Sequence, residues 1–295
     1  MIPEALLLRL VASFVAGFAI VALVTTLADM FGEGPAGFLG GLPSTGAVSF
    51  LAIGITQSPA AAIRATTLFP LGFSVTIAFL LFYSAPRGMR FGLRMALALG
   101  LWFFAASAVA TWSPDDFAFS VVASVAISMS VLLARSRVNT RKTAGVNTRP
   151  SALGVVLRGA LGGCVVDVVV ILSVVSGPLV GGVFAAAPAI WSSSLYVTNR
   201  AQGMEFSRSL TWTFMQTGFI VTIPFAIAAR YLFSVSGVWW GTLLTYVAVS
   251  PLAYLAWRLA NRRSTRGAGL LGRASSPRPS VLREGQDHDA EDDEC

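Results

Sequence analysis

The feature that most constrains this chain is a series of apolar runs, several of them close to 20 residues long. Lipid offers the backbone no hydrogen bonds, so a spanning segment must be a helix or part of a closed barrel. Barrel strands are about 10 residues long and alternate apolar with polar side chains. Continuous apolar runs near 20 residues instead match a helix that crosses the hydrocarbon core. We therefore predict an all-α fold, a polytopic transmembrane helical bundle.

Composition agrees with this prediction. Of the 295 residues, 55% are hydrophobic and 12% are charged, whereas a soluble domain has about 25% charged residues. The first run begins near Ala5 and lacks the basic segment that precedes a signal-peptide core, so we expect a retained helix. About nine spans are predicted, at residues 5–30, 38–56, 60–83, 93–112, 117–134, 152–175, 183–198, 209–233 and 238–260.

Polar segments divide the chain into four parts. Residues 1–134 form a first membrane repeat of about five spans, and residues 152–260 form a second of about four. A basic linker, 135–151, joins them. Residues 261–295 combine low apolar content with separated charge blocks, which predicts a disordered tail.

Arginine placement predicts the orientation of the spans. With nine spans, four basic segments fall on one side, and that side should be the cytoplasm. The loops predicted for the other side contain no arginine. We thus expect a multi-pass protein of the cell membrane, with its N-terminus outside and its C-terminus in the cytoplasm. The basic segments are 86–90, 135–149, 199–208 and 262–273, and the opposite loops are 113–116, 176–178 and 234–237.

The inventory of reactive residues argues against several kinds of site. Cys164 and Cys295 are too few for a disulfide framework or a metal cluster. The single histidine, His288, lies in the acidic tail, so neither a Ser-His-Asp triad nor a histidine-based metal site is expected. We predict no enzyme activity, no cofactor and no metal. The basic residues lie mostly in loops, which argues against nucleic acid as a partner. The expected partners are the lipid bilayer and a small solute or ion, and homo-oligomerisation is left open.

The two halves share an internal repeat. Gly72–Phe79 and Gly218–Phe225 are identical at six of eight positions. Further pairs follow in the same order in both halves, which indicates duplication. These pairs are Leu8-Arg9 with Leu157-Arg158, Gly34-Pro35 with Gly177-Pro178, Pro43 with Pro188, Gln57 with Gln202, and Arg64 with Arg208 to within a residue.

Five spans precede the second copy, so the copies should be inserted in opposite orientations. Inverted repeats of this kind recur in secondary transporters, whose substrate site lies near the bilayer midplane where the copies meet. The alternative is that a small protein of dual topology duplicated and fused for stability alone.

The second span of each copy is irregular. Pro43, Ser44 and Thr45 follow three glycines in the first copy, and Pro188 precedes Ser192 and Ser193 in the second. Proline frees a backbone carbonyl within a helix, and a nearby hydroxyl can satisfy it or bind a ligand. Each segment is predicted to be a broken or re-entrant helix that lines a substrate pathway. The alternative is close helix packing through small residues.

Three charged residues are further candidates. Asp167 is the one acidic residue near the middle of a predicted span, where a carboxylate usually faces a cavity or a partner. It is expected either to line the pathway or to have a purely structural role. Arg64 and Arg208 lie near span ends, where side chains commonly reach toward the interface. Their symmetric positions also allow a role as contacts for an anionic substrate.

The segment Gly41-Leu-Pro43-Ser44-Thr45, followed by Arg64-Ala-Thr66-Thr67-Leu-Phe69, resembles the GlpM type of small prokaryotic membrane protein. Members of that family look like one short repeat, so this chain would be two fused copies. The second copy departs from the pattern, with Ala189 after Pro188 and Ser209-Leu210 after Arg208. The resemblance implies an inner-membrane protein linked to envelope polysaccharide production, and it brings no catalytic residues.

Two functions follow from these observations. The leading hypothesis is a permease or channel for a small solute or ion, with its pathway between the inverted copies. The alternative is a non-transporting accessory protein that supports envelope polysaccharide synthesis or scaffolds a complex.

Overall fold

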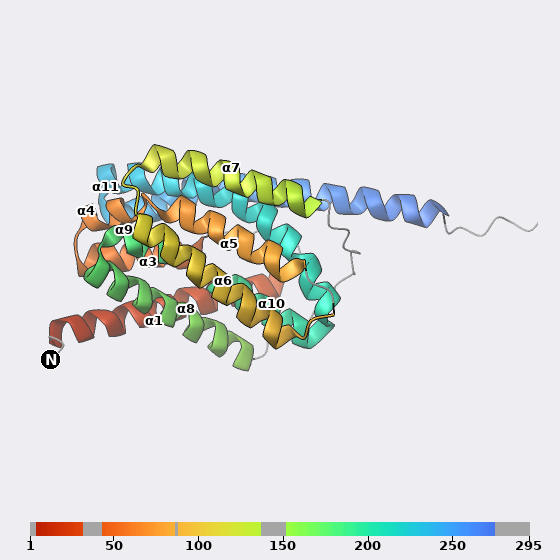
Figure 1. Cartoon of the computed structure of the whole chain (residues 1–295), viewed down its shortest axis with the longest axis horizontal. Coiled ribbons are helices and arrows are strands. Elements are labelled where there is room, and N and C mark those ends of the chain that lie inside the picture. The colour runs from red at the N-terminus through yellow and green to blue at the C-terminus, as the bar shows by residue number, and fades with distance from the viewer. Residues whose placement is uncertain (1–3, 32–42, 86–87, 137–151, 275–295) are drawn as a thin grey trace, which may run out of the picture. The chain divides into compact units, whose positions relative to one another are not determined.

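A computed structural model describes residues 4–31, 43–85, 88–136 and 152–274, and every regular element within these ranges is a helix (Figure 1). Five helices are long and apolar enough to cross a membrane, or six if the bent pair α4 and α5 counts as one span. The protein is therefore an all-helical, membrane-spanning protein, while the count of nine spans stays a prediction. The helices are α1 (Glu4–Phe31), α3 (Ser44–Thr56), α4 (Pro59–Ala65), α5 (Phe69–Ser84), α6 (Phe91–Trp112), α7 (Phe117–Ser136), α8 (Ala152–Ser176), α9 (Pro178–Ala185), α10 (Ala189–Gln202) and α11 (Met204–Ala274).

Helix α11 folds back on itself at Gly237. The rings of Phe225 and Tyr246 have their centroids 5.8 Å apart, whereas 21 residues of straight helix would separate them by about 31 Å. Gly237 has φ 73° and ψ 174°, a conformation open essentially to glycine alone. Two antiparallel segments therefore stand where the sequence predicts spans 209–233 and 238–260.

Two predicted spans are broken. Span 60–83 is divided into α4 and α5, which are bent by 44° across residues 66–68. Span 183–198 is divided into α9 and α10 by residues 186–188. Pro188 explains the second break, because proline lacks an N–H and its ring clashes with the carbonyl four residues earlier. Residues 32–42, which precede the paired Pro43, lie outside the described part of the chain.

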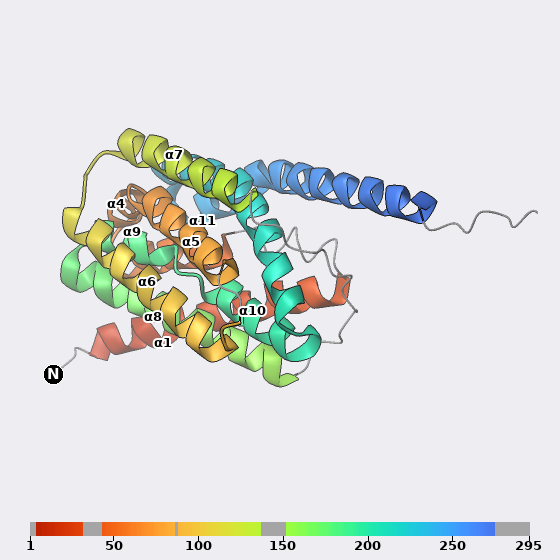
Figure 2. The same ribbon diagram turned by 45° about the vertical axis from the view of Figure 1, so that its right-hand side comes forward.

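Helices α1 and α8 pack closely in antiparallel directions (Figure 2). Phe14 lies against Gly163 and Phe18 against Gly159. Residue numbers therefore increase along α1 while those of the contacted residues decrease along α8, as in an antiparallel pair. Gly17 similarly faces Val166. Glycine at these positions allows the two backbones to approach, which is how helices associate where lipid removes the hydrophobic driving force.

Helix α6 shows the pattern of a helix that faces lipid. Its buried residues recur every four positions, and several between them are exposed and apolar, among them Phe103 and Phe104. Three alanines, Arg94 and Trp102 thus face the bundle while large apolar side chains face outward, which is stable only in a lipid environment. The buried positions are Arg94, Ala98, Trp102, Ala106 and Ala110.

Buried arginine side chains donate hydrogen bonds to the last backbone carbonyls of α5. Arg208 donates to the Ser84 carbonyl through Nε and Nη2, at 2.9 and 2.7 Å, and Arg94 donates to the Tyr83 carbonyl at 2.9 Å. These carbonyls have no acceptor role within their own helix. A third buried arginine, Arg135, lies within charge–charge range of Arg208.

By its internal contacts the chain divides into Met1–Ala260 and Asn261–Cys295, the second unit beginning where the sequence predicts the tail. Helix continues through Ala274, and residues 275–295 lie outside the described ranges.

The close approach of α9 to α4 gives a first prediction. A Cβ on Gly182 would overlap the carbonyl oxygen of Ala65, whereas a Cβ on Gly100 of α6 has nothing within 4 Å. Gly182→Ala should therefore lower the free energy of unfolding by about 1–3 kcal/mol. Gly100→Ala should be neutral or stabilise by up to about 1 kcal/mol, because alanine favours helix. Unfolding of both variants in detergent micelles measures the difference, and equal stability would contradict the packing described.

Candidate functional site

Helices α3 and α10 both begin at one pocket inside the bundle. It contains residues from both halves of the chain and has a cavity volume of about 50 Å³. A water molecule needs about 10–15 Å³ on this measure, so the pocket has room for a few waters or a small ion. Its walls are Pro43–Gly46 at the start of α3, Phe69, Phe73 and Thr76 on α5, Ala185–Pro188, Ile190 and Trp191 around the α9–α10 break, and Thr222 on α11.

Proline precedes both helices, and their first amides have no side-chain cap. Pro43 has φ −78° and ψ 58°, and Pro188 has φ −78° and ψ 37°. Helix N-caps are usually Ser, Thr, Asp or Asn, whose oxygen accepts from the first amides. Ala47 is the first residue of α3 to donate within the helix, to the Pro43 carbonyl at 2.9 Å. The amides of residues 44–46 therefore have no acceptor within α3, and the positive end of the helix dipole faces the pocket.

Three hydroxyl groups in the pocket walls also lack partners. Ser44, Thr45 and Thr222 are buried, and none of them forms a side-chain hydrogen bond within the described ranges. A buried polar group left unsatisfied costs about 1–3 kcal/mol. The Ser44 hydroxyl is such a group, and with the unbonded hydroxyls of Thr45 and Thr222 around the same cavity it favours a site that holds water or a polar ligand.

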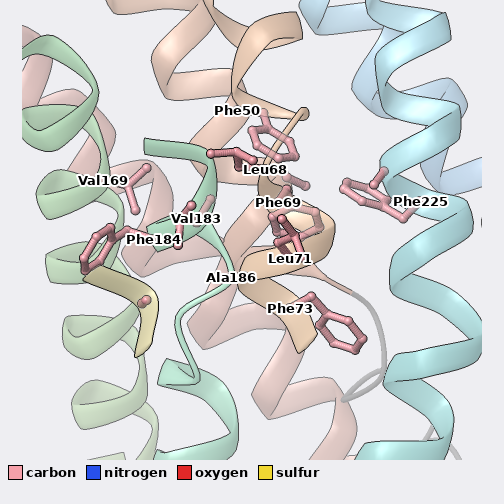
Figure 3. Packing of buried hydrophobic residues seen from close by; sticks show 14 of the residues in the cluster. Phe50, Leu68, Phe69, Leu71, Phe73, Val169, Val183, Phe184, Ala186 and Phe225 are labelled. Carbon is pink, nitrogen blue, oxygen red and sulfur yellow. The ribbon is translucent and has the colours of Figure 1, made fainter. Parts of the chain in front are cut away.

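A fourth hydroxyl, that of Thr76, holds the α9–α10 connection in place. It donates to the Ala186 carbonyl at 2.6 Å and accepts from Trp102 Nε1 at 2.8 Å. Figure 3 shows Ala186 in the non-helical segment between α9 and α10, near Leu71. The bond satisfies a carbonyl that the break in the helix sets free.

Most of the other carbonyls at this break are also occupied, and that of Ala185 is the exception within the described ranges. The amides of Ala186 and Ala187 donate to Val183 and Phe184 at 3.2 and 3.0 Å, and the amide of Ala189 donates to Ala187 at 2.9 Å. The backbone at the break therefore presents few open acceptors to the pocket, while the helix starts present open donors.

Aromatic rings form one wall of the pocket. Phe73 and Trp191 meet edge to face, with ring centroids 5.9 Å apart, and Trp191 stacks on Phe214 at 6.0 Å. Among the described residues that line the pocket, none has an ionisable side chain. Within the described ranges no three His, Cys, Asp or Glu residues are grouped as metal ligands would be.

The structure brings part of the predicted site together. Pro43, Ser44, Thr45 and Pro188 all line the pocket. Ser192 and Ser193 do not line it: their hydroxyls donate back to the carbonyls of Ala189 and Ile190 within α10.

The charged candidates lie elsewhere. Asp167 accepts a hydrogen bond from Ser13 of α1 at 2.7 Å and is not part of the pocket lining. Arg64 forms an exposed ion pair with Asp115 at 2.6 Å. Arg208 binds Ser84, as described above, and Glu205 at 2.9 Å.

Sequence reasoning missed Thr76 and Thr222 as site residues. They occupy the same position in the two most similar segments, Gly72–Phe79 and Gly218–Phe225. That identity marks them out, and their meeting at one pocket requires the fold.

Comparison with protein-family models, with curated proteins and with solved structures found no match. The GlpM-type resemblance stays a prediction, and the function is argued below from the geometry of the pocket.

The unequal bonding of the two threonines can be tested. Thr76→Val should lower the free energy of unfolding by about 2–3 kcal/mol, because Ala186 and Trp102 both lose a buried partner. Thr222→Val removes no hydrogen bond and should leave stability unchanged or slightly higher. Chemical unfolding in detergent compares the two variants. A similar loss in both would contradict the bonding pattern.

Proposed function

We propose that this protein is an integral membrane permease or channel for a small solute or ion, with a pathway that runs between two inverted repeats. The observation that carries the proposal is the convergence of two uncapped helix starts on one pocket that has hydroxyl groups in its walls. In transporters, half-helices inside the membrane line substrate sites in this way, with their N-termini pointing at the substrate. The broken helix α9–α10 supplies one such start, and α3 supplies the other.

The repeat pairs meet at this pocket, which supports the repeat. Pro43 and Pro188 are paired in the sequence, and so are Thr76 and Thr222; all four line the same cavity. In inverted-repeat transporters the substrate site lies where the copies meet.

The packing of α1 against α8 supports the opposite orientation of the copies. The pairing of Arg9 with Arg158 makes Phe14 equivalent to Gly163, and Gly17 to Val166. Each of these equivalent pairs is itself a contact. Self-contact of equivalent positions is expected at a two-fold axis, and the antiparallel run of the helices is what an axis in the membrane plane requires.

Arginine grouping supports the proposed orientation. Arg94 and Arg135 each lie within charge–charge range of Arg208. They follow or adjoin three of the four segments predicted to be cytoplasmic. One end of the bundle is thus strongly basic, and we assign that end to the cytoplasm.

The accessory-protein alternative calls for a dry and fully packed contact between the halves. The unpartnered hydroxyls of Ser44, Thr45 and Thr222 favour a wet pathway instead.

Cysteine labelling tests the topology. In a background without Cys164 and Cys295, Gln57→Cys should react with a membrane-impermeant maleimide in intact cells. Gln202→Cys should react only after permeabilisation, because paired positions of inverted repeats lie on opposite sides. Labelling of both positions from one side would refute the inverted repeat.

Flux measurements test the pathway. In the same cysteine-free background, purified protein in liposomes should conduct at least one solute among chloride, rubidium and glycerol. Thr45→Cys treated with a methanethiosulfonate reagent should lose about nine-tenths of that flux, because the reagent fills a cavity of about 50 Å³. Ser49→Cys is the matched control: Ser49 is buried on the same helix but does not line the pocket. Absence of flux for all three solutes would refute the proposal.

A further inference from the structure

We infer that the pocket binds and passes a small monovalent anion of about the size of chloride. This inference rests on the proposed function, because it names the class of solute that the same pocket conducts. It follows from four features of the pocket: the helix ends, the unpartnered hydroxyls, the occupied carbonyls and the absence of fixed charge.

Two helix starts place positive partial charge at the pocket. Helix α3 has 13 residues and α10 has 14, long enough for each N-terminus to carry about half an elementary charge. In α10 the first ladder donor is Ser192, to the Pro188 carbonyl at 2.8 Å, so the amide of Ile190 has no acceptor within the helix. Together with the amides of residues 44–46, it gives the pocket backbone donors from two directions.

Ser44 is an independent sign of a ligand. Its hydroxyl is buried, with 1% of the residue exposed, lines the pocket and has no hydrogen-bond partner within the described ranges. A hydroxyl in that situation donates to whatever anion or water occupies the cavity. Thr45 and Thr222 are also buried and line the pocket, and neither forms a side-chain hydrogen bond within the described ranges.

The acceptor groups that a cation would need are scarce. No carboxylate lines the pocket in the part of the chain that the structure describes, and hydrogen bonds occupy the carbonyls of Val183, Phe184, Ala186 and Ala187. In transporters, unwound carbonyls and helix C-termini hold sodium ions. Here most of the carbonyls at the break are satisfied, that of Ala185 excepted, whereas the open backbone groups at the two helix starts are donors, so an anion is favoured.

The surroundings limit the size and charge of the anion. The cavity of about 50 Å³ is bounded by Phe69, Phe73 and Trp191, which cannot replace a hydration shell. No lysine or arginine of the described ranges lines it, so a dianion would lack a countercharge in a site where desolvation is costly. A single negative charge, shared among amides and hydroxyls, meets both limits.

Radioactive tracers in liposomes test this inference. The full chain should exchange radioactive chloride at least about tenfold faster than protein-free liposomes, while uptake of radioactive rubidium and of glycerol stays at the protein-free level. Tracer exchange detects both channels and carriers. Rubidium or glycerol flux without chloride flux would overturn the inference and leave the proposed function standing. Absence of all three fluxes would overturn both.

Serine variants locate the site. Ser44→Ala should weaken half-saturation by chloride about tenfold, because it removes a hydrogen bond to a charged group. Ser49→Ala should have no effect, although Ser49 is equally buried and unpartnered on α3. Thr222→Val should also weaken half-saturation, whereas Thr222→Ser keeps the hydroxyl and should retain chloride affinity. Equal effects of Ser44→Ala and Ser49→Ala, or of the two Thr222 variants, would refute the assigned site.

Discussion

The hydrogen bond from Thr76 to the Ala186 carbonyl is the interaction on which the arrangement of the pocket depends. At 2.6 Å, it satisfies a carbonyl that Pro188 prevents from joining a helix. Water is not available inside a bilayer to do the same, so an irregular segment there survives only when the protein itself supplies the partner. Trp102 in turn donates to the same hydroxyl and fixes its direction. The bond ties the end of α9 to α5, which leaves the start of α10 facing the start of α3.

Close packing through glycine keeps these broken elements in place. A Cβ on Gly72 would lie 2.5 Å from the Val183 carbonyl oxygen, and one on Gly182 would overlap Ala65. The short helix α9 is therefore held against α5 on one side and α4 on the other. Eight residues of helix would not be stable alone, so tertiary contact supplies the stability that its length does not.

The sequence predicted the helices well because lipid imposes one rule on every span. Apolar length locates α6, α7 and α8, and proline locates the break at Pro188. The side of each helix that faces the bundle could not be predicted in this way, because a helix that is apolar all round has no pattern that distinguishes its sides. The depth of Asp167 could be predicted, but not that it faces Ser13 of α1 rather than the pocket. For the same reason Thr76 and Thr222 were visible only as a repeated motif.

Residues that are paired in the proposed repeat have different roles at the pocket. Thr76 and Thr222 are equivalent in the repeat, yet Thr76 holds the backbone and Thr222 leaves its hydroxyl open to the pocket. Gly46 is the counterpart of Trp191 in the repeat. Gly46 leaves room for the Phe69 ring, which a Cβ on Gly46 would approach to 2.7 Å. Trp191 instead forms part of the aromatic wall of the pocket. A dimer of identical small subunits would have to use one residue for both tasks. Under the proposed duplication, fusion releases that constraint, so one copy can stabilise the break while the other shapes the cavity for its ligand.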